Sequence, residues 1–171
     1  HKLDHTILLN QVKLNLYTNK QSRILSELND SDKQPKLRTY KLFKTCYCLE
    51  PYLTSNLPNK TYTNIARFRV SSHNLKIETG RHDKPKTPTE ERKCDKCNND
   101  EIEDELHCLI TCSANIMPRM ELFNKVTNII PNFFNLNEVE QLKALMANKE
   151  PELIYALDNF LNKVMLTTTT K

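Results

Sequence analysis

Residues 94–112 read CDKCNNDEIEDELHCLITC and carry three cysteines and one histidine with the spacing of a metal knuckle. Cys94 and Cys97 can direct two thiolates at one ion. Nine residues separate Cys97 from His107, and four more separate His107 from Cys112. Zinc is commonly held by three cysteines and one histidine, with sulfur at about 2.3 Å and imidazole nitrogen at about 2.0–2.1 Å. The spacing predicts one zinc site, and four protein ligands leave no open coordination position, so we expect the zinc to be structural.

Cys108, the neighbour of His107, is interpreted as part of the packed interior rather than as a metal ligand. Neighbours on a helix point about 100° apart, so Cys108 does not easily face a metal together with His107, and we interpret it as a packed thiol. We expect His107 and Cys112 to share one helical face. An alternative stays open, in which the cysteines are buried thiols and the histidine is an unrelated surface residue.

Two other groups of potential ligands are interpreted without a metal. Cys46 and Cys48 have no matching pair elsewhere, so we predict that they are buried thiols. An acidic run follows the knuckle and can suggest a hard-cation site. We predict instead that it forms the solvated first turn of the ligand helix, where negative charge suits the helix dipole. The run comprises Asp100, Glu101, Glu103, Asp104 and Glu105.

Composition predicts a helical fold around the knuckle. The 171 residues include a single glycine, and hairpins and barrels use glycine at their turns. Apolar residues make up 38% of the chain, which suits a modest core under a large polar shell. We therefore predict a mainly α fold, a helical domain with one embedded Cys3His zinc knuckle.

Apolar residues at helical spacing locate the expected helices. The first covers residues 6–28 and is broken near Thr18 and Asn19, and the second is a short basic helix over residues 36–47. Further helices are expected over residues 60–70, from Pro118 onward, over 137–146, and over 152–165 with Pro151 at its first turn. Residues 82–93 hold two prolines and many charges and are expected to form an exposed loop. Gly80, the only glycine, is expected in a left-handed conformation.

These elements give five predicted segments. They are an N-terminal helical segment (1–35), a basic helical region with its loop (36–93), the zinc knuckle (94–117), the C-terminal helices (118–166) and a frayed tail (167–171). No apolar run reaches the length that spans a bilayer, so we expect no membrane partner. Metal binding by clustered ligands in a lysine-rich chain favours an intracellular protein over a disulfide-linked secreted one.

Positive charge gathers in the middle of the chain. The net charge is +4, yet residues 36–96 hold fourteen lysines and arginines against six aspartates and glutamates. A phosphate-binding surface needs such an excess. Tyrosines and Phe68 are interleaved with these cations and can stack on bases where they are exposed. Two alternatives stay open: the aromatics belong to the core, and the lysines form a solvated face.

Four stretches of the chain resemble a known family. They are KLRTYKLFK at 36–44 leading to EPYL at 50–53, ARFR at 66–69 followed by HNLKIETGR at 73–81, ERKCDKC at 91–97 with IEDELH at 102–107 and Cys112, and PELIYAL at 151–157 through Phe160. Together they resemble the region C-terminal to the polymerase domain in reverse transcriptases of non-long-terminal-repeat retrotransposons. Relatives often carry tryptophans before the KLRTY stretch, whereas this chain has none.

The resemblance implies a zinc-stabilised domain that binds nucleic acid, either template RNA or target DNA, and is not catalytic by itself. It also implies a nuclear location and, as a further partner, the polymerase domain of a larger chain. The acidic motif of a polymerase palm is absent from this sequence. The residues that we expect to contact nucleic acid are Arg38, Lys41, Arg67, Arg69, Lys76, Arg81, Arg92 and Lys93. Because Arg67 and Arg69 cannot share one helical face, we expect at least one of them to pair with a carboxylate.

Two other functions stay open. The first is a protein-interaction module that docks onto a polymerase or has become an adaptor. The second is a metal-dependent nuclease, which needs clustered carboxylates with a lysine. The acidic residues after Cys112 show no such local arrangement.

Overall fold

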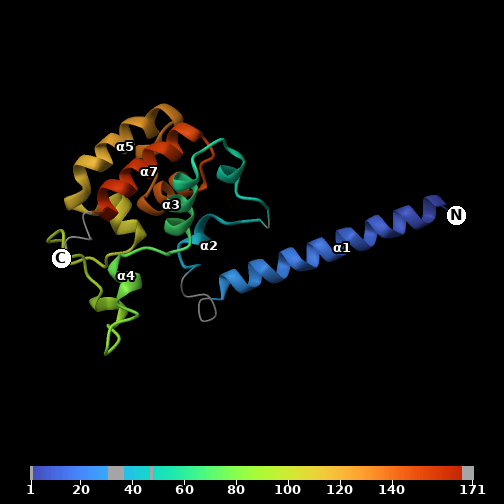
Figure 1. Ribbon diagram of the computed structural model, residues 1–171, viewed down its shortest axis with the longest axis horizontal. Coiled ribbons are helices and arrows are strands. Elements are labelled where there is room, and N and C mark those ends of the chain that lie inside the picture. Colours follow the sequence, from blue (N-terminus) through green and yellow to red (C-terminus); the bar gives the residue numbers. More distant parts are fainter. Residues whose placement is uncertain (1, 31–36, 47, 167–171) are drawn as a thin grey trace. The chain divides into compact units, whose positions relative to one another are not determined.

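The computed structural model describes residues 2–30, 37–46 and 48–166 (Figure 1). Within these ranges every regular element is helical, apart from one isolated antiparallel bridge between Lys93 and Ile102. The predicted mainly α fold is confirmed. The chain forms two compact units, His1–Cys48 and Leu49–Lys171, and each is described by itself. The predicted frayed tail, 167–171, lies outside the described residues.

The first unit consists of one long helix and one short helix. Helix α1 (Lys2–Asn29) is continuous, so the predicted break near Thr18 is wrong. The Thr18 hydroxyl donates to the carbonyl of Leu14 at 2.9 Å, which satisfies this polar group inside the helix. Of the predicted helix over 36–47, only α2 (Tyr40–Phe43) is helical in the described residues.

The cysteine pair of the first unit also differs from its prediction. Cys46 and Cys48 are joined by a disulfide rather than being free thiols. Cys48 is exposed and Cys46 is half-buried, so the expected burial is wrong as well. A bond between two cysteines this close in sequence needs no matching pair elsewhere in the chain, so the lack of such a pair does not predict free thiols.

The second unit has a helical part made of four helices. Helix α3 (Asn59–Arg69), helix α6 (Glu138–Ala147) and helix α7 (Pro151–Leu166) confirm three predicted helices. Helix α5 (Ile116–Ile129) begins two residues before Pro118, which occupies its first turn. Asn137 caps α6, because its side chain accepts from the Glu140 amide while Glu140 reaches back to the amide of Asn137. Short 3-10 helices lie at Pro51–Thr54 (η2) and Phe133–Asn135 (η6).

Helix α7 organises the core of this part, since it packs against both α5 and α3 (Figure 1). Its buried face carries Leu157, Phe160 and Leu161, which meet an apolar interior that α5 and α3 also line. Burying one such side chain stabilises a fold by about 1.5–3 kcal/mol. The helices α3 and α7 are also joined by a buried hydrogen bond of 2.8 Å from the Thr61 hydroxyl to the Asp158 carboxylate.

The remaining part of the second unit connects α3 to α5 with short elements. They are α4 (Lys76–Thr79), the 3-10 helices η3 (Thr89–Glu91) and η5 (Ser113–Asn115), and the π-helical turn η4 (His107–Thr111). Among the described residues, no helix is both long enough and apolar enough to cross a membrane.

Gly80 follows α4 and contradicts its prediction. Its φ of −60° and ψ of −13° are right-handed helical values, so a positive φ is not the reason for glycine here. The reason is close packing. A Cβ at this position would lie 2.8 Å from Cγ, Cδ and Nε of Arg92, a separation that real Cβ atoms do not tolerate.

Candidate metal centre

The structure brings the four predicted ligands together. One ligand atom from each of Cys94, Cys97, His107 and Cys112 lies within 4.8 Å of the others. The sulfurs of Cys94 and Cys112 are 3.9 Å apart, and Sγ of Cys97 lies 3.3 Å from Nε2 of His107. Tetrahedral zinc would set such sulfur–sulfur and sulfur–nitrogen pairs about 3.8 Å and 3.6 Å apart. The cluster therefore has the size and donor set of a four-coordinate metal site.

A short turn positions the first two cysteines. The Cys94 amide donates to the Glu101 carbonyl at 2.9 Å, and the Glu103 amide donates to the Arg92 carbonyl at 2.9 Å. These bonds form the antiparallel bridge, and the chain between them folds back into the knuckle. Asp100 reverses the chain with a φ of 57°, and its carboxylate pairs with Lys93 at 2.6 Å.

The π-helical turn η4 positions the other two ligands. His107 and Cys112 are five positions apart, and five residues of an α-helix turn the side chain about 140° away from its starting direction. The expected shared face therefore does not arise from an ordinary α-helix. The Cys112 amide instead donates to the His107 carbonyl at 2.8 Å, the spacing of a π-helix. This wider turn brings positions five apart onto one side.

Glu101 and Thr111 fix the orientation of the histidine. Nδ1 of His107 lies 2.6 Å from a Glu101 carboxylate oxygen and 3.0 Å from the Thr111 hydroxyl. The Thr111 hydroxyl donates to the same carboxylate oxygen at 2.7 Å. Because an ionised carboxylate only accepts, Nδ1 donates a hydrogen bond to Glu101, and Nε2 is the ring nitrogen that faces Cys97. A carboxylate behind a histidine ligand is the usual support of such a ligand in metal sites.

The charge on Glu101 agrees with this role. Hydrogen bonds from Thr111, and after them from His107, lower the pKa of the Glu101 carboxyl, although partial burial opposes them. The carboxylate thus stays ionised at neutral pH and holds the imidazole in one tautomer. Sequence reasoning missed both supporting residues, because it read Glu101 only as one member of an acidic run.

The three cysteines of the cluster differ in acidity. Burial raises the pKa of Cys94 to about 12, although backbone amides at Lys96 and Cys97 oppose it, and burial also raises the pKa of Cys112. Burial alone would raise the pKa of Cys97, but hydrogen bonds from the Asn99 amide and from neighbouring side chains outweigh burial and lower this pKa. A divalent cation therefore has to displace protons from at least the two buried thiols, which couples metal binding to pH.

Cys108 has the predicted role of a packed thiol. Its side chain is 2% exposed, and burial raises its pKa. The side-chain amide of Asn115 donates to the backbone carbonyl of Cys108 at 2.9 Å, so the fold holds Cys108 in place. Arg119 supports the same turn, because its guanidinium donates to the carbonyls of Leu109 and Cys112.

The prediction that the acidic run is solvated is wrong for two of its members, Glu103 and Glu105. Glu103 is 5% exposed and accepts from the Lys76 amide at 2.9 Å and from Lys96 at 3.1 Å. Glu105 is fully buried, where it accepts from the Ser71 hydroxyl and contacts His73 at 2.8 Å. Both carboxylates tie the metal segment to the chain before it.

Arg92 is the largest departure among the predicted nucleic-acid contacts. It was expected to face solvent, but its side chain is buried. Its guanidinium donates to the Ile77 carbonyl at 2.7 Å and to the Thr87 carbonyl at 2.8 and 3.0 Å. Arg92 therefore closes the base of the proline loop and cannot offer its charge to a ligand without opening it.

The other predicted contact residues fall into four groups. Arg69 is buried and pairs with Glu50 at 2.5 Å, which confirms that one of the two arginines of α3 pairs with a carboxylate. Arg67 is exposed. Three residues take part in ion pairs: Lys76 with Asp95 and Lys93 with Asp100 at the surface, and Arg81 with the buried Glu78. Arg38 and Lys41 belong to the first unit and are half-buried there.

Comparison with known proteins gives no relative. No protein-family model, no curated protein and no solved structure matches this chain.

Proposed function

We propose that this chain is a zinc-stabilised nucleic-acid-binding domain, without catalytic activity of its own, of the kind found C-terminal to the polymerase domain in retrotransposon reverse transcriptases. Its ligand is RNA or DNA, and its place is the nucleus. The proposal rests on two features that adjoin in the chain, the Cys3His cluster and the basic loop before it. For the resemblance to reverse transcriptases, the support is the four sequence stretches alone.

Zinc is the metal that the donor set favours. Three thiolates and one imidazole suit a borderline-soft ion without geometric preference, whereas magnesium and calcium take oxygen ligands. The four donors complete a tetrahedron, so the proposed role of zinc is to hold the turn and η4 together. Nucleic-acid binding then depends on the surface that the metal keeps in place.

The observation that carries the nucleic-acid proposal is the geometry of the proline loop, residues 82–88. His82, Lys84 and Lys86 are exposed at its tip, while the one carboxylate of the loop, Asp83, accepts from the Thr87 hydroxyl at 2.5 Å. Buried Arg92 holds the loop at its base, next to Cys94. Lys84 and Lys86 form no ion pair with a carboxylate of the described residues, and with the base held by Arg92 they form a cationic projection, as contact with phosphates requires.

Salt-dependent binding tests the proposal. The affinity of the full chain for labelled RNA and DNA duplexes is measured by fluorescence anisotropy over a salt series. The variant Lys84→Gln/Lys86→Gln should bind more weakly, and its slope of log K against log salt should be smaller by about 1 per lost phosphate contact. The control is Lys143→Gln/Lys149→Gln, which removes the same charge from α6 and its C-terminal side. Equal affinities and slopes in both variants would contradict this assignment.

A specific observation also favours the interaction module as a second candidate. Helix α1 exposes large apolar side chains: Ile7 and Leu14, seven positions apart and therefore on one face, are each more than half exposed. Such a surface is typical of a helix that packs on another protein. The proposed partner is the polymerase domain of a larger chain. Replacing Ile7 and Leu14 by Gln should leave nucleic-acid affinity unchanged and weaken association with that domain; unchanged association would remove this candidate.

A further inference from the structure

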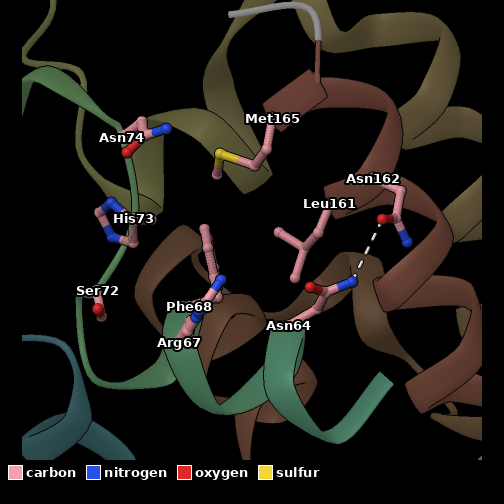
Figure 2. A pocket seen from close by; sticks show the side chains of 9 residues that line it. All are labelled: Asn64, Arg67, Phe68, Ser72, His73, Asn74, Leu161, Asn162 and Met165. Carbon is pink, nitrogen blue, oxygen red and sulfur yellow. Dashed lines mark hydrogen bonds between the residues drawn. The ribbon is translucent and has the colours of Figure 1, made fainter. Parts of the chain in front are cut away.

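The helical part of the second unit contains a cavity of about 250 Å³ that lies apart from the metal cluster residues and the proline loop. Helix α3, the segment after it and the end of α7 line it (Figure 2). Its walls combine apolar side chains, three asparagines, a histidine, a serine and an arginine. The lining residues are Asn64, Arg67, Phe68, Ser72, His73, Asn74, Leu161, Asn162 and Met165.

Asn64 presents an acceptor of fixed orientation. Its Nδ2 donates to the Asp158 carboxylate at 2.8 Å and to Oδ1 of Asn162 at 3.3 Å. Figure 2 shows that Oδ1 of Asn64 points away from Asn162, toward the side where Arg67 and Phe68 lie. No hydrogen bond to this oxygen is formed within the described residues, so it can accept from a ligand.

The remaining carboxylates and the histidine near the cavity are occupied. Asp158 accepts from Thr61 and Asn64, and Glu105 accepts from Ser71. Nε2 of His73 contacts Glu105 at 2.8 Å, and its Nδ1 accepts from the Leu75 amide at 3.4 Å. These groups are therefore engaged in hydrogen bonds within the fold.

Arg67 supplies positive charge at the rim. Its side chain is exposed, and it has no ion pair with any carboxylate of the described part of the chain. This distinguishes it from Arg69 on the same helix, which is buried against Glu50. An exposed, unpaired guanidinium beside a partly apolar cavity is suited to an anionic ligand with a flat, uncharged group.

We propose that this cavity receives one unpaired base of a single-stranded nucleic acid, with the adjoining phosphate on Arg67. The inference deepens the proposed function and rests on it. Phe68, Leu161 and Met165 pack against the ring of the base, and Oδ1 of Asn64 accepts a hydrogen bond from an exocyclic amino group of the base. The cavity is smaller than the roughly 300–1,000 Å³ of sites for drug-sized ligands, so it fits one base rather than a dinucleotide.

The acceptor predicts a base preference. Cytosine carries an amino group where uracil carries a carbonyl oxygen, so the two bases differ at the atom that would face Asn64. A carbonyl oxygen there would face another acceptor. Single strands of cytosine should therefore bind more tightly than single strands of uracil, even though their phosphates are identical.

The test compares the ten-residue RNAs C10 and U10 with an RNA duplex, all at one salt concentration, on the full chain. C10 should bind roughly three- to tenfold more tightly than U10. Arg67→Gln should weaken C10 binding by a similar factor and leave duplex binding unchanged, because the duplex offers no unpaired base. Lys60→Gln, which removes the same charge from an exposed position at the start of α3, is the matched control.

A second measurement locates the base. In side-chain amide NMR spectra, the signals of Asn64, Asn74 and Asn162 should shift when C10 is added, while that of Asn137, the N-cap of α6, should not.

Three outcomes overturn the inference. If C10 and U10 bind equally, or if Arg67→Gln acts no differently from Lys60→Gln, the cavity is not a base site, and binding at the proline loop stands. If the asparagine signals stay in place on addition of saturating C10, the base binds elsewhere. If neither single strands nor duplex bind at low salt, the proposed function and this inference both fail.

Discussion

The two parts of the second unit are built on different physical principles. In the helical part, α3, α5, α6 and α7 bury aliphatic and aromatic side chains, such as Val126, Phe133 and Phe160. In the part between α3 and α5, buried polar side chains are as numerous as buried hydrophobic ones. Seven of the twelve buried polar or charged residues among those described fall between Ser71 and Asn115.

The difference indicates which part would gain most from a bound metal. Apolar burial by the helices stabilises their arrangement without any ligand. A turn of irregular backbone around buried carboxylates, arginines and thiols gains less from the hydrophobic effect, and a metal ion bound by its four ligands would add stabilisation there. We therefore expect the part between α3 and α5 to unfold first and the helical part to stay folded when it does.

Loss of a ligand should produce the largest effect. Cys94→Ser should abolish metal binding, because structural zinc contributes about 10–16 kcal/mol in small finger peptides and requires its full ligand set. Amide hydrogen exchange should then accelerate over residues 92–117, while α3 and α7 keep their protection. Cys108→Ala is the control and should retain the metal, since Cys108 packs against Asn115. Equal acceleration in α7 would show that the two parts are not independent.

Removing the support of the histidine should weaken the site without destroying it. Glu101→Gln takes the charge from the partner of His107 Nδ1, and loss of such a supporting group typically costs about 10–100-fold in metal affinity. Competition with a chelator measures the change. Asp100→Asn removes a neighbouring carboxylate that pairs with Lys93 and leaves His107 untouched, so its affinity should match that of the unmodified chain. An effect as large as that of Glu101→Gln would contradict the assigned role of Glu101.

A smaller effect is expected at the contact of Gly80 with Arg92. At right-handed helical angles, alanine is favoured over glycine by about 0.5–1 kcal/mol, so an open site would make Gly80→Ala stabilising. Because the new Cβ meets the Arg92 side chain, overpacking of about 1–3 kcal/mol should prevail and lower the melting temperature. In an Arg92→Ala background the same change should cost less. Additive effects of the two substitutions would show that the contact is not responsible.

The contrast between the two parts also explains which features could be predicted from the sequence and which could not. Helices α6 and α7 follow from regular apolar spacing and from Asn137 and Pro151 at their starts, because burial and capping act locally. The knuckle follows from the rarity of four close ligands. Arg92, Glu103 and Glu105 could not be placed, since their burial depends on backbone carbonyls and amides that only the folded loop brings near. The π-helical turn could not be predicted either, because arguments from periodicity assume the spacing of an α-helix.

The metal content of natively purified protein tests the central claim most directly. Elemental analysis should find one zinc per chain, and X-ray absorption at the zinc edge should show three sulfurs at about 2.3 Å and one nitrogen at about 2.0–2.1 Å. That shell corresponds to Cys94, Cys97, Cys112 and Nε2 of His107. Protein that is folded, with the protected helices α5 and α7, yet contains no zinc or shows an oxygen in place of a sulfur would contradict the account.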